Sequence, residues 1–486
     1  MLENEKQFKT AMLAYLSSRE VATNDLRVYA RTIGVESPTT KKNDVLMEEI
    51  TAILLGELEP VPISRHGAPV KNKVVNPAVL QKINALCEEY HIFDKYKEKQ
   101  PKSDNVLPKL FPKGTSLVFE DATEINQDES VAFCGQVSVL NGVTYILPLD
   151  AKNGKKILLA DKLVEEHLLK EGDVVNCQAM QGRTTLVATQ ILSVNGFVAK
   201  SFTRSDFDEG IPCYPEEPLE LGEVDKKSLK YFDWVLPIRK GQRACIVAPP
   251  KAGKSQALYD LAISIGKGNS KTSVFVLLID QSPEAVGKFR RAFENDKVVY
   301  TTYEDDAERQ VFAAEFLLKR AKRFVEHGLD VVLFVDSLTS LARAYNETDE
   351  SSGGKVLAGG MESKTLQYIK RFFGAARKIE NGGSLTIVGA VSADTGNPAD
   401  ELVCSELVGV SNFEVRLSGD LAAKHVYPAI EPLKSKTGDG APITQADQIL
   451  RSKYLPKFGV ESFLNLLGES KTKEDFYKAL QNAIEV

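Results

Sequence analysis

The sequence predicts an α/β protein in three parts: a small helical module, a small β-barrel, and a C-terminal domain built on a parallel sheet. Three observations support this prediction. After residue 225, continuous apolar runs alternate with long amphipathic helices, as in strands that are covered on both faces. Short strands of alternating polarity fill residues 108–202, and residues 1–58 carry apolar side chains at helical spacing.

Composition indicates an ordinary globular protein. The 486 residues are 43% hydrophobic, which is enough for about three domains with conventional cores. No apolar run is long enough for a membrane span, and the first residues lack a signal-peptide pattern, so we expect a cytoplasmic protein with no membrane partner. The net charge of −6 argues against nucleic-acid binding by bulk charge alone. Any affinity for nucleic acid must then come from a few basic residues at particular positions and from stacking.

The N-terminal module, residues 1–58, is predicted to contain a helix–loop–helix unit. One helix ends at Gly34, an extended stretch contains Pro38, and a new helix begins at about Lys42. Residues 59–107 have the composition of a linker, with one short helix that Pro77 opens.

The strand-rich segment, residues 108–202, contains a hairpin signal. Asn141-Gly142 separates two short apolar stretches, at residues 137–140 and 143–147, which is typical of a two-residue β-turn. Several further strands and a helix near residues 161–169 indicate an oligonucleotide-binding (OB) type barrel. Periodicity alone, however, favours an unspecified small β domain. A second linker, residues 203–225, leads to the final domain, residues 226–486.

Residues 248–255, Ala-Pro-Pro-Lys-Ala-Gly-Lys-Ser, have the order of a phosphate-binding loop between a strand and a helix. Backbone N–H groups at the start of such a helix face phosphate oxygens. Lys254 is predicted to reach the β- and γ-phosphates, and the Ser255 hydroxyl to hold Mg²⁺. Gly253 lets the backbone approach closely, because it has no Cβ. The sequence therefore predicts a site for a nucleoside triphosphate.

Two further strand ends belong to this predicted site. The apolar run at residues 331–335 ends in Asp336, and a carboxylate at the end of a neighbouring strand can hold Mg²⁺ through water. Hydrolysis also needs a group that orients or deprotonates the attacking water. The natural place for that group is the end of the strand at residues 278–280, where Gln281 and then Glu284 follow.

Several sequence blocks occur together in one order. They are Pro237-Ile-Arg-Lys-Gly-Gln-Arg243, the phosphate loop, Asp336-Ser-Leu-Thr-Ser-Leu-Ala-Arg343, Gly354-Lys-Val-Leu-Ala-Gly-Gly360, Arg371-Phe-Phe-Gly-Ala-Ala-Arg377 and Asp394-Thr-Gly396. In these blocks the chain resembles the Rho family of bacterial transcription termination factors, which are ring-shaped hexameric RNA translocases. The resemblance implies a RecA-like P-loop ATPase domain after an OB-type RNA-binding barrel. It also implies ATP and Mg²⁺ as cofactors, with single-stranded RNA and RNA polymerase as partners of a homohexameric ring.

The resemblance also implies roles for residues around the nucleotide. Lys254 and Gln281 occupy catalytic positions, with Glu284 as a candidate beside them, and Ser255 and Asp336 form the metal site. The residues that the resemblance assigns to nucleotide binding are Arg239, Lys240, Gly241, Gln242, Arg243, Ala244, Lys251, Ala252, Gly253, Lys254, Ser255, Gln256 and Ser282.

Around the nucleotide, four of the chain's residues depart from the family pattern. Gln281 replaces the glutamate that activates water, and Ser282 and Ser340 each replace an arginine. Gly419 stands where the family carries its arginine finger, whose loss alone costs about 10³ to 10⁵ in rate. The candidate substitutes for these groups are Glu284, Arg343 and Arg416.

The RNA-binding positions are partly retained. Lys355 and Val356 resemble the family's central-pore loop that grips RNA. Thr395 and Gly396 belong to the second pore loop, in which Pro398 replaces a lysine.

In the barrel, three positions differ from the family. Val143 and Tyr145 stand where the family has two phenylalanines, and Leu147 where it has an arginine. Of these, only Tyr145 can stack on a base, a contact worth about 1–3 kcal/mol.

Three hypotheses follow. The first is an ATP-dependent RNA translocase that terminates transcription, with hydrolysis weakened by the loss of charged groups at Gln281, Ser340 and Gly419. The second is a Rho-like ring that binds ATP and RNA without hydrolysing ATP, and acts as a regulator or scaffold. The third is another ring ATPase, such as a rotary or secretion subunit, against which the N-terminal modules and the Lys355 loop count.

Overall fold

The computed structural model describes residues 2–18, 21–32, 35, 40–55, 58, 79, 82–83, 131–151, 156–182, 185–198, 204–268, 272–348, 356–438 and 440–485. The chain divides into two compact units, residues 1–104 and 105–486. Most of the predicted linker at residues 59–107, and residues 108–130 of the predicted barrel segment, lie outside the described residues. No helix in the described part of the chain has the length and hydropathy needed to cross a membrane.

The first unit is a small helical module. Its helices are α1 (Leu2–Leu16), α2 (Thr23–Thr32) and α3 (Asn43–Leu55). The helix–loop–helix predicted around residues 26–46 is present as α2 and α3. Apolar side chains from all three helices form its core, among them Phe8, Met12, Leu26, Leu46 and Ile50.

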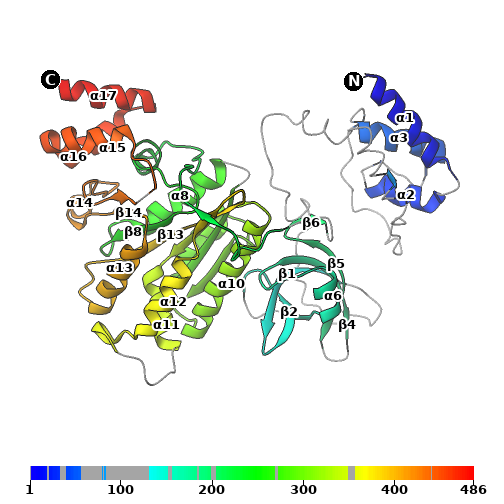
Figure 1. The fold of residues 1–486 in the computed structure, drawn as a ribbon, viewed down its shortest axis with the longest axis horizontal. Coiled ribbons are helices and arrows are strands. Elements are labelled where there is room, and N and C mark those ends of the chain that lie inside the picture. The colour runs from blue at the N-terminus through cyan, green and yellow to red at the C-terminus, as the bar shows by residue number, and fades with distance from the viewer. Residues whose placement is uncertain are drawn as a thin grey trace. The chain divides into compact units, whose positions relative to one another are not determined.

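In the second unit, a barrel of the OB type comes first along the chain (Figure 1). Its elements are β1 (Val131–Leu140), β2 (Val143–Leu147), β3 (Ile157–Leu158), α6 (Asp161–Glu166), β4 (Val174–Gln181), β5 (Leu186–Val194) and β6 (Phe197–Val198). The strand order is β3-β2-β1-β4-β5-β6, and β3 also pairs with β5 in parallel. This last pairing closes the sheet, so that it has no long open edge.

The predicted hairpin joins β1 to β2. Leu140 pairs with Val143, and the two turn residues have positive φ, 50° at Asn141 and 77° at Gly142. Two consecutive residues with positive φ are the signature of a type I′ turn, whose twist matches that of the strands. Ile146 of β2 points into the barrel, where it is fully buried.

The remainder of the second unit is an α/β domain. Its strands are β7 (Pro212–Cys213), β8 (Arg243–Ala248), β9 (Thr272–Gln281), β10 (Val298–Thr302), β11 (Asp330–Asp336), β12 (Arg377–Ile379), β13 (Ser384–Ser392), β14 (Phe413–Arg416) and β15 (Lys436–Thr437). Its helices are α7 (Lys227–Lys230), η1 (Tyr231–Val235), α8 (Lys254–Gly268), α9 (Pro283–Ala292), α10 (Ala307–Glu326), α11 (Leu338–Thr348), η2 (Ala358–Gly360), α12 (Ser363–Phe373), α13 (Pro398–Val410), α14 (Gly419–Ala423), α15 (Gln445–Ile449), η3 (Leu450–Tyr454), α16 (Leu455–Glu469) and α17 (Lys473–Glu485).

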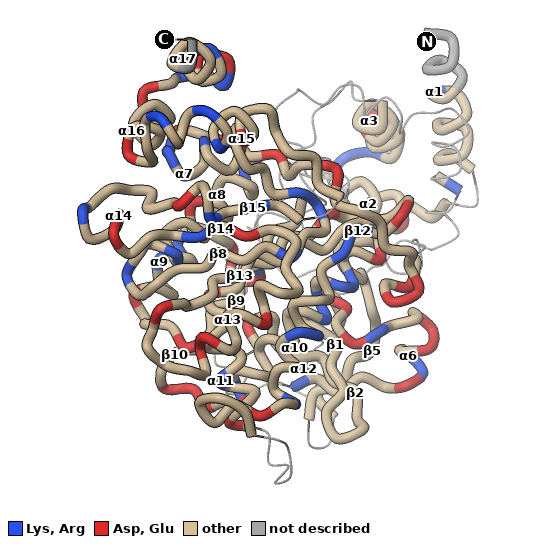
Figure 2. The backbone as a smooth tube through the Cα atoms, turned by 60° about the vertical axis from the view of Figure 1, so that its left-hand side comes forward, with Lys and Arg blue, Asp and Glu red and all other residues tan. Residues whose placement is uncertain are grey.

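The central strands of this domain run parallel in the order β10-β9-β11-β13-β8-β14. Alternate residues of β11 face opposite layers: Leu333 lies in the core with α10, α11 and α12, and Phe334 in the core with α8 and α9. This burial on both faces explains the continuous apolar runs of the sequence. In the view of Figure 2, basic and acidic positions are interspersed along these elements.

A fully buried arginine connects the barrel to the α/β domain. Arg320 of α10 donates from Nε to Gln136 Oε1 of β1 at 2.7 Å, and from Nη2 to the carbonyl of Leu149 at 2.6 Å. Gln136 in turn donates to the carbonyl of Phe316 at 2.7 Å. Because every one of these groups is buried, the junction depends on their mutual hydrogen bonds.

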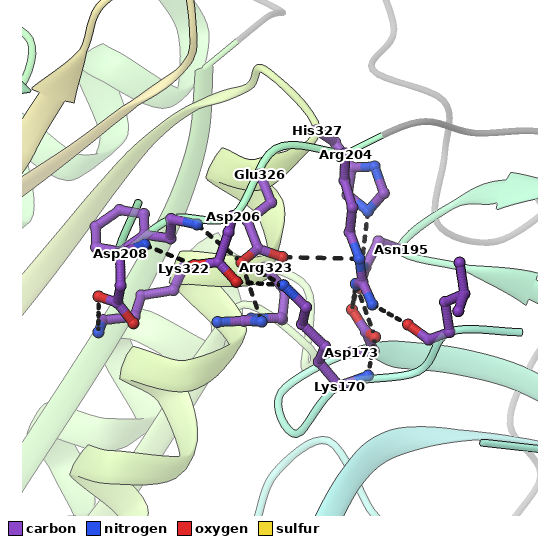
Figure 3. A network of polar contacts seen from close by, with 12 residues as sticks. Lys170, Asp173, Asn195, Arg204, Asp206, Asp208, Lys322, Arg323, Glu326 and His327 are labelled. Carbon is purple, nitrogen blue, oxygen red and sulfur yellow. Dashed lines mark hydrogen bonds and ion pairs between the residues drawn. The ribbon is translucent and has the colours of Figure 1, made fainter. Parts of the chain in front are cut away.

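A second polar network links the barrel, the segment after it and the end of α10 (Figure 3). Arg204 donates to both carboxylate oxygens of Asp173, at 2.7 and 2.9 Å. Glu326 accepts from the backbone N–H of Phe207 at 3.0 Å, and its carboxylate also pairs with Arg323 at 3.0 Å. The segment from Arg204 to Asp208 is thereby held against both neighbours.

His327, at the end of α10, makes this second network sensitive to pH. Its ring lies 3.0 Å from Asn195 Nδ2 and stacks on Phe197, with Asp173, Arg204 and Arg323 as the charged groups around it. Burial lowers the pKa of His327 to about 4; the charge of Asp173 opposes this shift, and the two arginines add to it.

We expect the folded protein to lose stability as the pH falls from about 6.5 toward 4. An unfolded histidine has a pKa of about 6.5, so in this range the unfolded state binds more protons than the folded state. Because the ring is partly exposed, the expected loss at pH 5 is about 1–2 kcal/mol. Urea unfolding at pH 7.5 and pH 5 measures it, with His327→Gln as the control that removes the titrating ring. An equal loss in both proteins would contradict the assignment to His327.

Candidate functional site

The phosphate loop connects the end of β8 to the start of α8. Residues 249–253 turn sharply, with φ of 62° at Lys251 and 98° at Gly253. A glycine adopts this left-handed conformation without strain, whereas a residue with a Cβ rarely does. The first N–H groups of an α-helix have no intrahelical acceptor. The turn therefore leads into a helix N-terminus that suits a phosphate group.

Lys254 is held at the carboxyl edge of the sheet. Its Nζ donates to Ser392 Oγ, at the end of β13, at 2.5 Å. Burial lowers the pKa of Lys254, while the charges of Asp336 and Asp400 act in the opposite direction. The ammonium thus lies where phosphate oxygens would add a compensating charge. Ser392 is a contact that the sequence analysis missed, because the last residue of an apolar strand carries no motif.

Ser255, at the start of α8, and Asp336, at the end of β11, lie near each other although β8 and β11 are not neighbouring strands. We expected Asp336 on a strand next to the phosphate loop; instead β13 lies between β8 and β11, which corrects that expectation. Burial raises the pKa of Asp336, opposed by a hydrogen bond from the Ser255 side chain and by the charge of Lys254. A hydroxyl near a carboxylate suits a hard cation such as Mg²⁺, which would neutralise charge on the β- and γ-phosphates.

The expected catalytic positions are occupied by side chains with other partners. Gln281 ends β9, and its Nε2 donates to the carbonyl of Ile279 at 3.2 Å. Ser282 caps α9, accepting from the N–H of Ala285 at 3.2 Å. Glu284 is exposed, and hydrogen bonds from its own N–H and from Ser282 hold its pKa below the ordinary value. A carboxylate with a lowered pKa is a weaker base, and the catalytic role of Glu284 stays a prediction.

The candidate substitute arginines are both paired with buried carboxylates. Arg343 donates through Nε and Nη2 to Asp400, with distances of 3.0, 2.8 and 2.6 Å. Arg416 Nε donates to Glu414 at 2.5 Å. Each arginine would have to leave its carboxylate before it could contact a phosphate. Gly419 starts α14 beside the phosphate loop, where an added Cβ would lie 3.4 Å from Pro249, but it brings no charge there.

One group of predicted nucleotide contacts lies at the opposite edge of the sheet. β8 begins at Arg243 and the phosphate loop follows its last residue, so the length of the strand, about 17 Å, separates them. Lys240 pairs with Asp330 at 2.8 Å, and Arg243 donates to the carbonyl of Val410 at 2.7 Å. Arg239, Lys240, Gly241, Gln242, Arg243 and Ala244 therefore lie away from the phosphate loop of the same chain, and their assignment to nucleotide binding stays a prediction.

A cavity of about 410 Å³ adjoins the phosphate loop and was not predicted. It is bounded by Ala252, Gly253 and Gln256 from the loop and α8. The other residues in its wall are Lys226, Lys227, Ser228, Phe232, Ala257, Asp260, Leu417, Tyr427, Pro428, Ala429 and Ile430. A mostly apolar cavity beside a phosphate site suits the base of a nucleotide. Tyr427 lies outside every motif, and only the fold brings it to the loop.

We expect Tyr427→Ala to weaken ATP binding about ten- to a hundredfold. Stacking of a base on an aromatic ring is worth about 1–3 kcal/mol, and the half-exposed ring of Tyr427 is available for it. Equilibrium binding of a fluorescent ATP analogue measures the change. Tyr303→Ala, at an exposed tyrosine after β10, is the matched control. Equal affinity of the two variants would contradict this role.

The two predicted pore loops lie side by side, as far as they are described. Lys355 lies outside the described residues, whereas Val356 bridges to Glu362 and is 63% exposed. In the same loop, Gly359 approaches Ala399 so closely that a Cβ would come within 2.4 Å of its backbone nitrogen. Ala399 lies in the first turn of α13, the helix that follows Thr395 and Gly396. The chain therefore places Val356, Thr395 and Gly396 on one surface.

The second of these loops is connected to the nucleotide site. Thr395 Oγ1 donates to Asp400 Oδ2 at 2.8 Å, and the same carboxylate holds Arg343. Asp400 is completely buried, and its charge also acts on Lys254. The loop at Thr395 is thus hydrogen-bonded to a carboxylate whose charge acts on Lys254.

Tyr145 is only partly available for a base. It pairs with Ser138 across β1 and β2, and its half-buried ring packs against the core that the barrel shares with the α/β domain. Leu147, two residues further along the same face, is buried in that core. Stacking on Tyr145 is therefore restricted to the exposed part of its ring.

Comparisons with known proteins agree with this site. Residues 228–437 match the family model "ATP synthase alpha/beta family, nucleotide-binding domain". The chain is 39% identical over 287 residues to the transcription termination factor Rho of Pseudomonas aeruginosa, covering 57% of this chain and 68% of that protein. It is 35% identical over 341 residues to the transcription termination factor Rho of Cereibacter sphaeroides, covering 67% of this chain and 80% of that protein.

The same level of similarity extends to other bacteria. The transcription termination factor Rho of Escherichia coli (strain K12) is 39% identical over 289 residues, which cover 57% of this chain and 68% of that protein. Among solved structures, an ATPase from the type III secretion system of pathogenic bacteria has 19% identity and a TM-score of 0.46 over 61% of this chain and 94% of its own.

Proposed function

Because the chain belongs to the Rho family of transcription termination factors, we propose that it is an ATP- and RNA-binding ring protein that acts in transcription termination with weak ATP hydrolysis. Membership of the family supports the class of function, and the side chains of this chain support the weak hydrolysis. The partners in this proposal are single-stranded RNA, further copies of the chain in a homohexamer, and RNA polymerase.

One observation carries the proposal: the groups for binding are assembled and the groups for cleavage are not. Lys254, Ser255 and Asp336 converge on one point at the carboxyl edge of the sheet. By contrast, the amide of Gln281 bonds to its own strand, and it cannot accept a proton from water. Gly419 brings no charge beside the loop, where a positive group would stabilise the transition state.

The second candidate is a ring that binds ATP and RNA but regulates an active relative. The same substitutions favour it, since they remove hydrolysis without disturbing the phosphate loop. The two candidates differ only in turnover: a motor with weak hydrolysis has some that RNA increases, and a regulator has none. A rotary or secretion subunit is disfavoured by the OB-type barrel and by the pore-loop surface at Val356, Thr395 and Gly396.

Binding of MgATP to the purified protein tests the shared part of both candidates. We expect saturable binding by the natural chain and loss of at least tenfold in affinity in Lys254→Ala, because in this proposal the ammonium contacts the phosphates directly. Isothermal titration in the presence of Mg²⁺ measures both. If the two proteins bound MgATP equally, the phosphate loop would not be the site.

A further inference from the structure

One acidic side chain lies in the wall of the mostly apolar cavity beside the phosphate loop. Asp260 is on α8, one turn after Gln256, and is 6% exposed. Around it the cavity has apolar residues such as Phe232, Leu417 and Ile430. A carboxylate in such surroundings costs energy unless hydrogen bonds compensate it, so its presence calls for a physical reason.

Two donors hold the carboxylate of Asp260 in one orientation. Lys226 Nζ donates to Oδ1 at 2.5 Å, and Gln256 Nε2 donates to the same oxygen at 2.8 Å. Gln256 is itself oriented, because its Oε1 accepts from Lys288 Nζ at 2.6 Å. Both donors use Oδ1, and an ionised carboxylate has acceptor sites on each oxygen. The Asp260 carboxylate therefore retains acceptor capacity on Oδ2.

We propose that Asp260 determines which base the site accepts, by taking a hydrogen bond from an exocyclic amino group of the nucleotide. The inference rests on the proposed binding of ATP at this phosphate loop. Adenine presents such a group at N6, and an oriented carboxylate is the acceptor that suits it. A purine without the amino group cannot donate to the carboxylate. Its affinity is therefore lower, because the buried acceptor is left without its hydrogen bond.

An ion pair with Lys226 alone explains Asp260 less well. The Lys226 side chain is 57% exposed, and a pair with an exposed lysine contributes little to stability. The ion pair also does not explain the hydrogen bonds from Lys288 to Gln256 and from Gln256 to Asp260. Recognition of a base uses all three contacts, because together they fix the direction of the carboxylate.

The test compares ATP with purine riboside triphosphate, which differs from it by lacking the 6-amino group. Equilibrium binding of both to the full-length protein is measured with Mg²⁺, by competition with a fluorescent nucleotide. We expect the natural chain to bind ATP about ten- to a hundredfold more tightly than the analogue, since hydrogen bonds to charged groups are of that strength.

The variant Asp260→Asn should bring this ratio to within about threefold. Lys226 and Gln256 are both donors, so the amide oxygen must face them and the NH₂ group must face the cavity. That NH₂ group repels the amino group of adenine but can donate to the analogue's ring nitrogen. Lys267→Gln, at the other end of α8, is the control that should keep the natural ratio. Asp260→Ala, for which we expect the same loss of discrimination, replaces Asp260→Asn if the latter does not fold.

Each result has a distinct meaning. Tight ATP binding with a ratio that collapses only in the Asp260 variants supports the proposal. If the natural chain binds both triphosphates equally, or if the Asp260 variants keep its preference, Asp260 does not select the base, although the nucleotide site stands. If the natural chain binds neither triphosphate, the proposed function itself fails, and this inference fails with it.

Discussion

Gln281→Glu is expected to raise the rate of ATP hydrolysis about ten- to a hundredfold. The residue ends β9, next to the strand that carries Asp336, so a carboxylate there is placed to orient the attacking water. The natural amide donates to the carbonyl of Ile279, whereas a carboxylate would be repelled by that carbonyl and turned toward the site. A positioned general base contributes about 10²–10⁴ in rate, and the gain stays below this range because Gly419 still lacks a charge.

Steady-state phosphate release with saturating ATP, Mg²⁺ and cytosine-rich RNA measures this gain. The double variant Lys254→Ala/Gln281→Glu is the control, because any gain at the true site must disappear without the phosphate-loop lysine. A turnover equal to that of the natural chain would show that the missing base does not limit hydrolysis.

Arg320→Ala is expected to lower the free energy of unfolding by about 3–5 kcal/mol. The guanidinium is 1% exposed and bonds to Gln136 Oε1 and to the carbonyls of Leu149 and Asp296, at 2.6–2.7 Å. Its removal leaves three acceptors without their donor, two of them buried, and opens a cavity between the barrel and α10. Although burial lowers the pKa of Arg320 to about 10, the side chain stays charged at neutral pH.

Urea unfolding at pH 7.5 measures this loss, and Lys319→Ala is the matched control. Lys319 is the adjacent residue, but its ion pair with Glu171 is partly exposed and contributes about 0–1 kcal/mol. A change below about 1 kcal/mol in Arg320→Ala would mean that the junction does not depend on this residue.

Features of the chain that depend on local sequence were predicted well. A type I′ turn requires positive φ at both central positions, which Asn141 and Gly142 adopt readily, so the hairpin could be predicted from these two residues and the short apolar stretches beside them. The parallel strands and the phosphate loop are likewise local, because burial on both faces leaves a continuous apolar run and the loop has its own motif.

Features that depend on distant contacts could not be predicted in this way. Tyr427 reaches the cavity beside Gly253 only because the chain folds back after β14. The burial of Arg320 could not be predicted, because nothing in the sequence distinguishes it from the other basic residues of α10. The resemblance assigned Arg239 to nucleotide binding, and the sequence could not show that the length of β8 separates it from the phosphate loop of the same chain, because the two ends of a strand lie at opposite edges of the sheet.

The central claim is that this chain binds ATP at an assembled phosphate loop but cleaves it slowly. The most direct test is ATP turnover by the purified natural protein at saturating MgATP, with and without cytosine-rich RNA, beside Lys254→Ala. The account predicts bound ATP with turnover below about 0.01 s⁻¹, at least a hundredfold under the usual range of about 1–10³ s⁻¹. RNA-stimulated turnover of about 1 s⁻¹ or more, absent from Lys254→Ala, would contradict it and establish a working motor despite Gln281 and Gly419.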